Sequence, residues 1–248
     1  MALKVITQNV MVGQNSIGGS YGERRPLLKR ALFGADVIGL QEVMPLWKEA
    51  FDEDLAGYEH TLLYRSREQP EATPIYWKRE RFERLEDGHF WLSETPQTES
   101  YGWGAAYPRI CSWVRLYDRE EAYEFAFVNT HLDNVSAEAR VRGMEEIRSF
   151  VFERFSGLPV ILTGDFNDKP DSETIRVANR FLTDVRTFSD KPNFENTYHG
   201  FGTVSGSCID YVYVNAHFAC TRFEVIKERE GRSFQSDHYG LSATLTLK

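Results

Sequence analysis

Side chains capable of chemistry gather where apolar runs of the sequence end. They are carboxylates, amides and imidazoles that apolar patterning alone would not place there: Asn9, Glu42, His131, Asp165, Asn167, Asp210, Asp237 and His238. Most of them close or precede a run with strand character, such as PVILTG before Asp165. Because these residues belong to six separate segments, we expect the segments to bring them together at one edge of a sheet sandwich.

Converging groups of these types are typical of phosphoester cleavage. The leaving oxygen and the phosphoryl oxygens carry negative charge in the transition state, and a hard divalent cation with oxygen ligands stabilises both. Glu42 and Asp237 are therefore predicted to bind Mg²⁺, which prefers carboxylate ligands. Asp165 is the predicted base that orients and deprotonates the attacking water.

Amides and imidazoles complete the predicted site. Asn9 and Asn167 offer amide donors that position the phosphate and the base without adding charge. A protonated His131 or His238 would neutralise an equatorial phosphoryl oxygen. Asp210 is expected to hold one imidazole in the required tautomer and to raise its pKa.

Each motif also has a purely structural interpretation. The stretches GDFN (164–167) and SDH (236–238) are compatible with simple turns beside a strand. Glu42 can begin a helix, where a carboxylate favours the helix dipole, and His131 can be an ordinary buried histidine. Asp210 is the hardest to explain structurally, since an unpaired carboxylate in an apolar strand is costly. The presence of all these residues in one chain favours the catalytic interpretation.

The elements that must position these residues are mostly strands. Runs of β-branched and aromatic residues bounded by turn residues predict eleven strands, at about 3–9, 36–40, 60–64, 74–78, 82–92, 111–117, 124–129, 159–163, 208–214, 219–226 and 241–247. Apolar spacing predicts four helices, at 23–33, 45–55, 136–155 and from Asp171 or Ser172 to about 180. The basic pair Arg24 and Arg25 is expected to begin the first helix rather than to reach a cleft.

The order of these elements favours an α/β (α+β) fold over a regular βαβ series. Two mixed, mainly antiparallel sheets packed together, with helices outside them, accommodate eleven strands and four helices. The sequence has no internal repeat and no low-complexity linker. We therefore expect one domain spanning residues 1–248.

Composition limits the classes of substrate and partner and the cellular compartment that fit this protein. The net charge is −8, which argues against duplex DNA or long RNA as the main substrate because phosphate contacts dominate nucleic-acid affinity. Cys111, Cys208 and Cys220 are odd in number and widely spaced, as in a protein without a disulfide framework or zinc knuckle. The N-terminal run is no signal peptide, and no apolar stretch is long enough for a membrane span. These features predict a cytoplasmic protein without a membrane partner, and no obligate protein partner is evident.

Six stretches of the chain resemble the endonuclease/exonuclease/phosphatase superfamily, which includes nocturnin-like deadenylases. They are TQNV (7–10), IGLQEV (38–43), NTHLDN (129–134), LTGDFND (162–168), CIDYVYV (208–214) and SDHYGL (236–241). The resemblance implies a four-layer αββα sandwich and a Mg²⁺- or Mn²⁺-dependent hydrolase. It implies metal binding by Glu42, water activation by Asp165, and a role for Asp237 as a further metal ligand or as a partner of a ligand. Asn9 and Asn167 are expected to contact the phosphate or the nucleophile. His131 and His238 are expected to stabilise the phosphoryl group, with Asp210 paired to His238.

The segment 74–113 resembles a compact bacterial subgroup of the superfamily in which FWLSETP and a GWxxAxPRI-like stretch recur. Trp103, Tyr107 and Arg109 are predicted to stack on a sugar or base and to hold a second phosphate. The alternative is a structural loop whose aromatic rings pack on the rim of a sheet. Tyr198, within ENTYHGFG (195–202), is a further candidate for the substrate wall.

Four functions are compatible with the sequence. The leading one is a phosphohydrolase for a small or short substrate, such as a sugar phosphate, an inositol phosphate, a nucleotide or a short oligonucleotide. A nuclease or deadenylase-like exonuclease would instead stack single-stranded bases on the aromatic loop. A sphingomyelinase-like enzyme would need an exposed apolar hairpin or a secretion signal, and neither is visible in the sequence. An inactive binding module is disfavoured because every expected polar position is filled.

Overall fold

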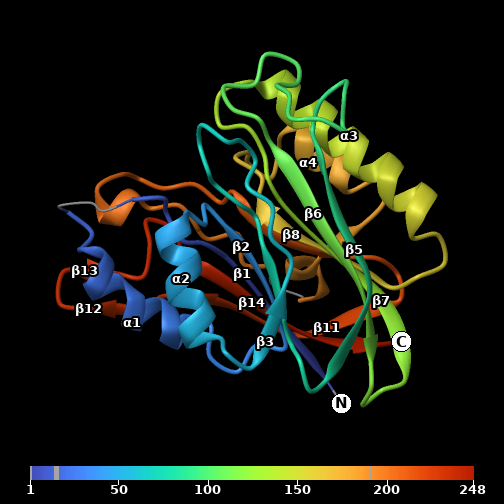
Figure 1. The fold of residues 1–248 in the computed structure, drawn as a ribbon, viewed down its shortest axis with the longest axis horizontal. Helices are drawn as coiled ribbons and strands as arrows, with labels where there is room; N and C mark the ends of the chain where they lie inside the picture. The colour runs from blue at the N-terminus through green and yellow to red at the C-terminus, as the bar shows by residue number, and fades with distance from the viewer. Residues whose placement is uncertain (1, 14–16, 190–191) are drawn as a thin grey trace.

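Two six-stranded sheets pack face to face in this computed structural model, which describes residues 2–13, 17–189 and 192–248 (Figure 1). The first sheet comprises, in spatial order, β11 (Phe218–Ile226), β14 (Gly240–Leu247), β1 (Leu3–Asn9), β2 (Val37–Gln41), β4 (Ile75–Lys78) and β3 (Tyr58–His60). The second comprises β5 (Phe82–Trp91), β6 (Ile110–Asp118), β7 (Tyr123–His131), β8 (Val160–Asp165), β10 (Asp210–Val214) and β9 (Thr183–Asp184). A short hairpin is formed by β12 (Arg229–Glu230) and β13 (Ser233–Phe234).

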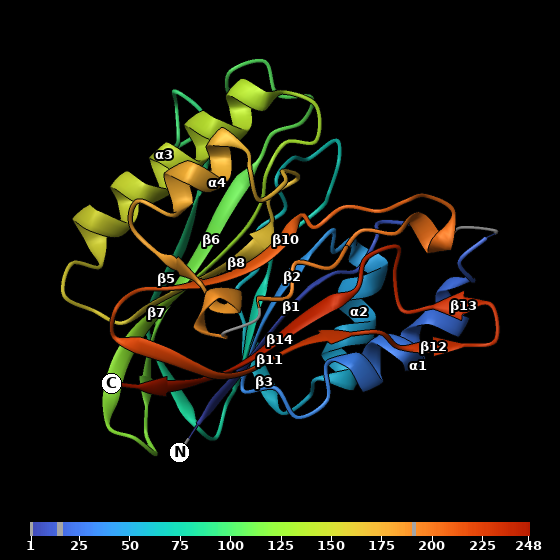
Figure 2. The ribbon, with the colours of Figure 1, turned by 180° about the vertical axis from the view of Figure 1, so that it is seen from behind.

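Four α-helices cover the outer faces of the sandwich (Figure 2). Over the first sheet lie α1 (Tyr21–Ala31) and α2 (Pro45–Asp54), and over the second lie α3 (Ala137–Arg154) and α4 (Glu173–Ala178). The predicted caps form: Ser136 and Ser172 accept a hydrogen bond from the first turns of α3 and α4. Two 3₁₀ turns, η1 (Val185–Phe188) and η2 (Gly200–Gly202), complete the elements. Within the described ranges, no helix combines the length and apolar character needed to cross a bilayer.

Alternation along the strands builds three apolar layers. Val5 of β1 and Val37 of β2 face the second sheet, whereas their neighbours Ile6 and Ile38 pack beneath α1 and α2. The second sheet repeats the pattern, with alternate residues in the shared core and beneath α3. The result is the predicted αββα sandwich, with one core between the sheets and one under each helical layer.

One predicted strand is wrong. Residues 60–64 do not continue into the sheet, because β3 ends at His60 and the chain then runs as a loop to β4. Isolated bridges from Ala72 to Tyr64 and Val43, and single hydrogen bonds such as that from Trp91 Nε1 to the Arg65 carbonyl (2.9 Å), hold this loop in place of a strand ladder. The apolar triplet before Arg65 resembles a strand, but the segment leaves the sheet edge. It delivers polar side chains to the cavity described below.

The strand pairings bring the predicted site residues to one edge of the sandwich. In the parallel pair β1–β2, Asn9 lies opposite Gln41, and in the parallel pair β7–β8, His131 lies opposite Asp165. Asp210 begins β10 opposite Asp165 because β10 runs antiparallel to β8. Likewise β14 runs antiparallel to β1, so the segment before it reaches the same edge. Register alone therefore gathers residues that lie far apart in the sequence.

A buried polar clamp joins the two sheets just below this edge. Asn129 of β7 donates from Nδ2 to the carbonyls of Leu40 (2.7 Å) and Pro74 (3.2 Å) in the first sheet. Its Oδ1 accepts from Gln41 Nε2 (2.7 Å) and from Thr163 Oγ1 (3.1 Å). Asn129 is fully buried, and a buried amide satisfied on both sides fixes the spacing of the sheets where the apolar core stops.

Replacing Gly164 of β8 by alanine is expected to lower the free energy of unfolding by about 3 kcal/mol. A Cβ there would lie 2.2 Å from the carbonyl oxygen of Thr130 on β7, so the two strands would have to separate. Urea denaturation measures the effect. Gly22→Ala in α1 is the matched control, since a Cβ there meets nothing within 4 Å. A Gly164→Ala variant as stable as Gly22→Ala would contradict the close approach.

Candidate active site

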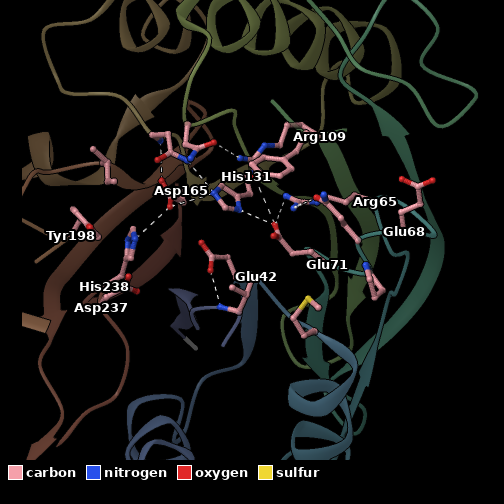
Figure 3. Close-up of a pocket in the computed structure, with 18 residues that line it drawn as sticks. Glu42, Arg65, Glu68, Glu71, Arg109, His131, Asp165, Tyr198, Asp237 and His238 are labelled. Atoms are coloured by element: carbon pink, nitrogen blue, oxygen red, sulfur yellow. Dashed lines mark hydrogen bonds and ion pairs between the residues drawn. The ribbon is translucent and has the colours of Figure 1, made fainter. Parts of the chain in front are cut away.

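A cavity of 670 Å³ lies at the edge where the strand ends converge. Figure 3 shows the side chains that turn into it from both sheets and from the neighbouring loops. The lining residues are Val12, Glu42, Met44, Arg65, Glu68, Gln69, Pro70, Glu71, Tyr107, Arg109, His131, Asn134, Asp165, Asn167, Tyr198, Ile209, Asp237 and His238. Its size is within the range of small-molecule sites, roughly 300–1,000 Å³.

Asp165 is the most densely contacted carboxylate of the cavity. Its Oδ2 accepts a hydrogen bond from Asn9 Nδ2 (2.9 Å), and its Oδ1 accepts one from the backbone N–H of Asn167 (2.9 Å). The Nε2 atoms of His131 and His238 lie 3.6 and 3.7 Å from the same Oδ2. Asn167 adopts a positive φ of 50°, which asparagine tolerates better than most residues. The GDFN turn thus fixes the orientation of the Asp165 carboxylate.

His238 forms a chain with two carboxylates. Its Nδ1 lies 2.9 Å from Asp210 Oδ2, which leaves Nε2 facing Asp165. Burial disfavours the charged imidazole, but the negative charges of Asp210 and Asp165 outweigh burial and raise the pKa of His238 to about 10. The imidazole is therefore protonated at neutral pH and can donate a hydrogen bond from Nε2. The predicted pairing of Asp210 with His238 is present in the structure.

His131 has its own carboxylate partner, Glu71, which the sequence analysis did not identify. Nδ1 of His131 lies 3.1 Å from Glu71 Oε1, and Nε2 lies 3.0 Å from the Asn167 side-chain amide. Burial opposes ionisation of Glu71, but the hydrogen bond and charge of His131, together with Arg65 and Arg109, keep the pKa of Glu71 below its usual value. Two imidazoles, each oriented by a carboxylate, therefore flank Asp165.

Glu42 is held in position by β1 and the loop after it. Oε1 accepts from Asn9 Nδ2 (3.0 Å), and Oε2 accepts from the backbone N–H of Val12 (2.8 Å). Its φ of 62° is unusual for a glutamate, and strained backbone of this kind is concentrated at functional sites. Burial raises the pKa of Glu42, His131 opposes this shift, and the carboxylates of Glu71 and Asp237 add to it.

Arg24 is a second contributor that the sequence analysis did not identify. It belongs to α1, as expected, but it is fully buried behind the site. Its guanidinium donates to the carbonyls of Gly13 (2.6 Å) and Val10 and packs over the Trp47 ring. Burial lowers the pKa of Arg24 to about 10, and the charges of Asp237 and Glu42 oppose that shift. The sequence around Arg24 and Arg25 does not indicate this role, because the burial of Arg24 arises from tertiary packing.

The predicted substrate residues divide into two groups. Tyr107, Arg109 and Tyr198 line the cavity, and the Tyr198 ring lies 5.0 Å from the His238 ring. Trp103 is not among the lining residues, so the structure does not bring it to the site. Its φ is 48°, and its carbonyl accepts a hydrogen bond from Ser136 Oγ (2.9 Å) at the start of α3. The alternative of a structural role therefore applies to Trp103.

Two groups of side chains have the donor types of a metal site. Asp165, Asp210 and His238 bring three ligand atoms within 4.8 Å of one another. Both nitrogens of His238 face a carboxylate, however, and a protonated imidazole has no lone pair for a cation. Glu42 and Asp237, the metal ligands predicted from the sequence, both line the cavity, and carboxylates are the ligand type that hard cations such as Mg²⁺ prefer. Both carboxylates interact with the charge of the buried Arg24, and no ion pair with an arginine or lysine is formed by either of them in the described parts of the chain.

Sequence and structure comparisons agree with this geometry. The family model described as Endonuclease/Exonuclease/phosphatase family matches residues 7–238. A mannosyl-6-phosphatase of Bacteroides thetaiotaomicron VPI-5482 is 28% identical, with a TM-score of 0.90 over 99% of this chain and 100% of that chain. An endonuclease/exonuclease/phosphatase family protein from the same species is also 28% identical, with a TM-score of 0.89 over 100% of this chain and 96% of that chain. A search of curated protein sequences returns no match.

More distant structures share the fold. The catalytic domain of human Nocturnin, with a bound sulfate anion, is 18% identical, with a TM-score of 0.79 over 100% of this chain and 94% of that one. Fold and site together define an enzyme that hydrolyses phosphoesters. The chain belongs to the endonuclease/exonuclease/phosphatase family, as its motifs predicted.

Proposed function

We propose that this protein is a divalent-metal-dependent phosphoester hydrolase in which Asp165 activates a water molecule for attack on phosphorus. The observation that carries the proposal is the setting of Asp165. Its carboxylate is fixed by Asn9 and by the Asn167 backbone, between two imidazoles that each have a carboxylate partner. The substrate is a small or short phosphorylated molecule.

The residues divide the chemistry among them. Asp165 accepts a proton from the attacking water and orients that water toward the phosphorus atom. His238, protonated at Nε2, donates a hydrogen bond to a phosphoryl oxygen and neutralises part of its developing charge. His131 lies on the other side of Asp165, with its Nε2 atom 3.0 Å from the Asn167 amide and 3.6 Å from Asp165 Oδ2. Each donor is fixed before the substrate binds, so little reorganisation is needed.

Glu42 and Asp237 are the proposed metal ligands. A bound Mg²⁺ or Mn²⁺ supplies positive charge that stabilises the phosphoryl and leaving oxygens. Asn9 bonds both Glu42 and Asp165 through its Nδ2 atom, with distances of 3.0 and 2.9 Å. This shared amide keeps the metal ligand and the base at a fixed separation.

The charge of the cavity favours a small substrate over a long nucleic acid. Its lining contains the carboxylates of Glu42, Glu68, Glu71, Asp165 and Asp237. Among the described residues that line it, two are arginines, Arg65 and Arg109, and none is a lysine. A strand of nucleic acid needs a basic track along its backbone, and this lining does not offer one. The mannosyl-6-phosphatase relative, named for a monoester of a small molecule, is consistent with this preference.

Removing the metal is expected to abolish hydrolysis of p-nitrophenyl phosphate, and Mg²⁺ or Mn²⁺ is expected to restore it. Glu42→Gln should raise the metal concentration for half-maximal activity by about tenfold to a hundredfold, because it removes a charged ligand. Titration of the EDTA-treated enzyme with each metal measures both effects. Glu49→Gln, on the exposed face of α2, is the control and should behave as wild type. Full activity in EDTA would overturn the metal dependence.

A further inference from the structure

The cavity has two halves of different character. One half surrounds Asp165, Asp237 and His238, where the proposed reaction takes place. The other lies beyond His131, on the side away from Tyr198 (Figure 3). We call it the distal half, and its lining residues are Arg65, Glu68, Gln69, Tyr107, Arg109 and Asn134. A substrate whose phosphate occupies the first half must place the rest of its structure here or in solvent.

The two arginines of the distal half already have acidic partners. Arg65 Nη1 lies 2.8 Å from Glu71 Oε1. Arg109 lies 3.8 Å from the same Glu71 oxygen through Nη1, and 3.5 Å from Asp133 Oδ2 through Nε. Both arginines are at least nine-tenths buried, with exposures of 7% and 4%. Arg65 is hydrogen-bonded to its carboxylate, whereas Arg109 Nε and Nη1 are buried without a hydrogen-bond partner and are balanced only by the nearby charges of Glu71 and Asp133.

The charge count of this half disfavours a second phosphate. Two guanidinium groups face the carboxylates of Glu71 and Asp133, and Glu68 adds a third negative charge at the rim. A phosphate dianion here would meet a net negative surrounding, with no free cation among the described residues that line it. Burying such a charge without compensation is strongly unfavourable. This balance differs from the expectation, drawn from the sequence, that Arg109 holds a second phosphate.

The aromatic ring of the distal half is occupied as well. The guanidinium carbons of Arg65 and Arg109 lie 4.7 and 5.4 Å from the centroid of the Tyr107 ring. Trp103, the other aromatic residue expected to stack on a base, is not at the cavity. A nucleobase stacking on Tyr107 would therefore compete with these two guanidinium groups for the ring. The distal half lacks the open aromatic platform that base recognition uses.

The polar groups that remain suit hydroxyl groups. The Asn134 Oδ1 atom accepts from Arg109 Nη2 (3.1 Å), and Gln69 Oε1 lies 3.5 Å from Arg65 Nη2. Both amide side chains are exposed, and Glu68 beside them is an exposed acceptor. These side chains place hydrogen-bond donors and acceptors close together and add little net charge. A ligand group that both donates and accepts hydrogen bonds can therefore pair with them. Sugar hydroxyls are groups of this kind.

We propose that the distal half binds the hydroxyl groups of a singly phosphorylated sugar, so that the enzyme selects sugar monophosphates over doubly phosphorylated sugars and nucleotides. The inference rests on the proposed function, because the phosphate is taken to lie beside Asp165. It goes further in naming the substrate class and the residues that recognise it. Arg109 is the central specificity residue, since it joins Tyr107, Asn134 and the carboxylates in one arrangement.

Binding to an inactive variant tests the proposal separately from catalysis. Asp165→Asn enzyme with Mg²⁺ is titrated calorimetrically with mannose 6-phosphate, glucose 6-phosphate, glucose 1,6-bisphosphate, AMP and inorganic phosphate. The tighter-binding hexose monophosphate is expected to bind at least tenfold more tightly than inorganic phosphate, the bisphosphate or AMP. Equal binding of inorganic phosphate would overturn the proposal, as would tighter binding of the bisphosphate or of AMP.

Two further variants locate the selectivity in the distal half. In the Asp165→Asn background, Arg109→Met should reduce the preference for the hexose monophosphate over inorganic phosphate about tenfold. Asn134→Ala, at an exposed position where folding is not at risk, should reduce it in the same direction. Arg176→Met, which removes an exposed guanidinium on α4, is the matched control and should leave the preference unchanged. An unchanged preference in both cavity variants would overturn the assignment of the distal half.

Failure of the proposed hydrolase function would give a different experimental result from failure of the sugar-binding proposal. Wild-type enzyme that does not hydrolyse p-nitrophenyl phosphate with Mg²⁺ or Mn²⁺ would refute the hydrolase itself. Wild-type enzyme that hydrolyses p-nitrophenyl phosphate, but shows no preference for a hexose monophosphate in binding, would refute only the sugar subsite.

Discussion

Asp165→Asn is expected to lower kcat on a phosphate monoester by about 10³-fold. The substitution keeps the shape of the side chain and its ability to accept from Asn9, but an amide cannot take a proton from water at neutral pH. KM should change far less, because the imidazoles and the proposed metal ligands that contact the phosphate remain. Initial rates of phosphate release at saturating Mg²⁺ measure the effect.

The next carboxylate in the same motif provides the control. Asp168 accepts from Arg140 Nε (3.0 Å) and from Thr174 Oγ1 (2.8 Å), and it does not line the cavity. Asp168→Asn should therefore affect stability more than turnover, with kcat within about threefold of wild type. If Asp165→Asn retained more than a tenth of the wild-type kcat, Asp165 would not be the base.

Replacing Asn129 by alanine is expected to lower the free energy of unfolding by about 4 kcal/mol. The change removes the side-chain donor to the Leu40 carbonyl and the acceptor shared by Gln41 and Thr163, so Gln41 keeps its bond to Thr7 (3.0 Å) and Thr163 only a longer contact to the Val128 carbonyl (3.4 Å). It also opens a cavity between the sheets, which adds to the cost. Urea denaturation followed by circular dichroism measures the loss.

An asparagine on the surface serves as the control, because it shows how much an amide outside this clamp contributes to the free energy of unfolding. Asn193 is exposed and makes a local contact to the backbone N–H of Glu195 (3.0 Å). Asn193→Ala should cost less than about 1 kcal/mol. If Asn129→Ala cost no more than this control, the clamp between the sheets would have no role in stability.

The fold was largely predictable because its elements have strong local patterns. The runs at 3–9, 36–40 and 159–163 are apolar and β-branched, and each forms a strand within one or two residues of the expected bounds. Ser136 and Ser172 mark the starts of two helices as expected. The two-residue strands β9, β12 and β13 were not predicted, because so short a pairing depends on the neighbouring strand rather than on its own sequence.

The strand-borne part of the site was predictable for a related reason. Asn9, His131 and Asp165 are polar residues at the ends of apolar strands, and register brings such ends together. Glu71 and Arg24 were missed because loop and helix packing, which has no local pattern, places them in the site. The same limit explains Trp103: its residue type suggested stacking, but the loop turns its backbone toward the start of α3.

The proposed hydrolytic residues lie on strands, whereas the residues of the distal half lie on loops. This separation affects how the substrate preference of such an enzyme can change during evolution. The groups proposed to perform hydrolysis stand at the ends of paired strands, where a shift of register in any one strand would displace its residue from the site. The residues of the distal half come instead from loops near 61–74 and 92–109 and from the turn after β7. Loops accept substitution and changes of length far more readily than paired strands do. A lineage can therefore exchange its preferred substrate by remodelling these loops, while the hydrolytic centre is inherited intact.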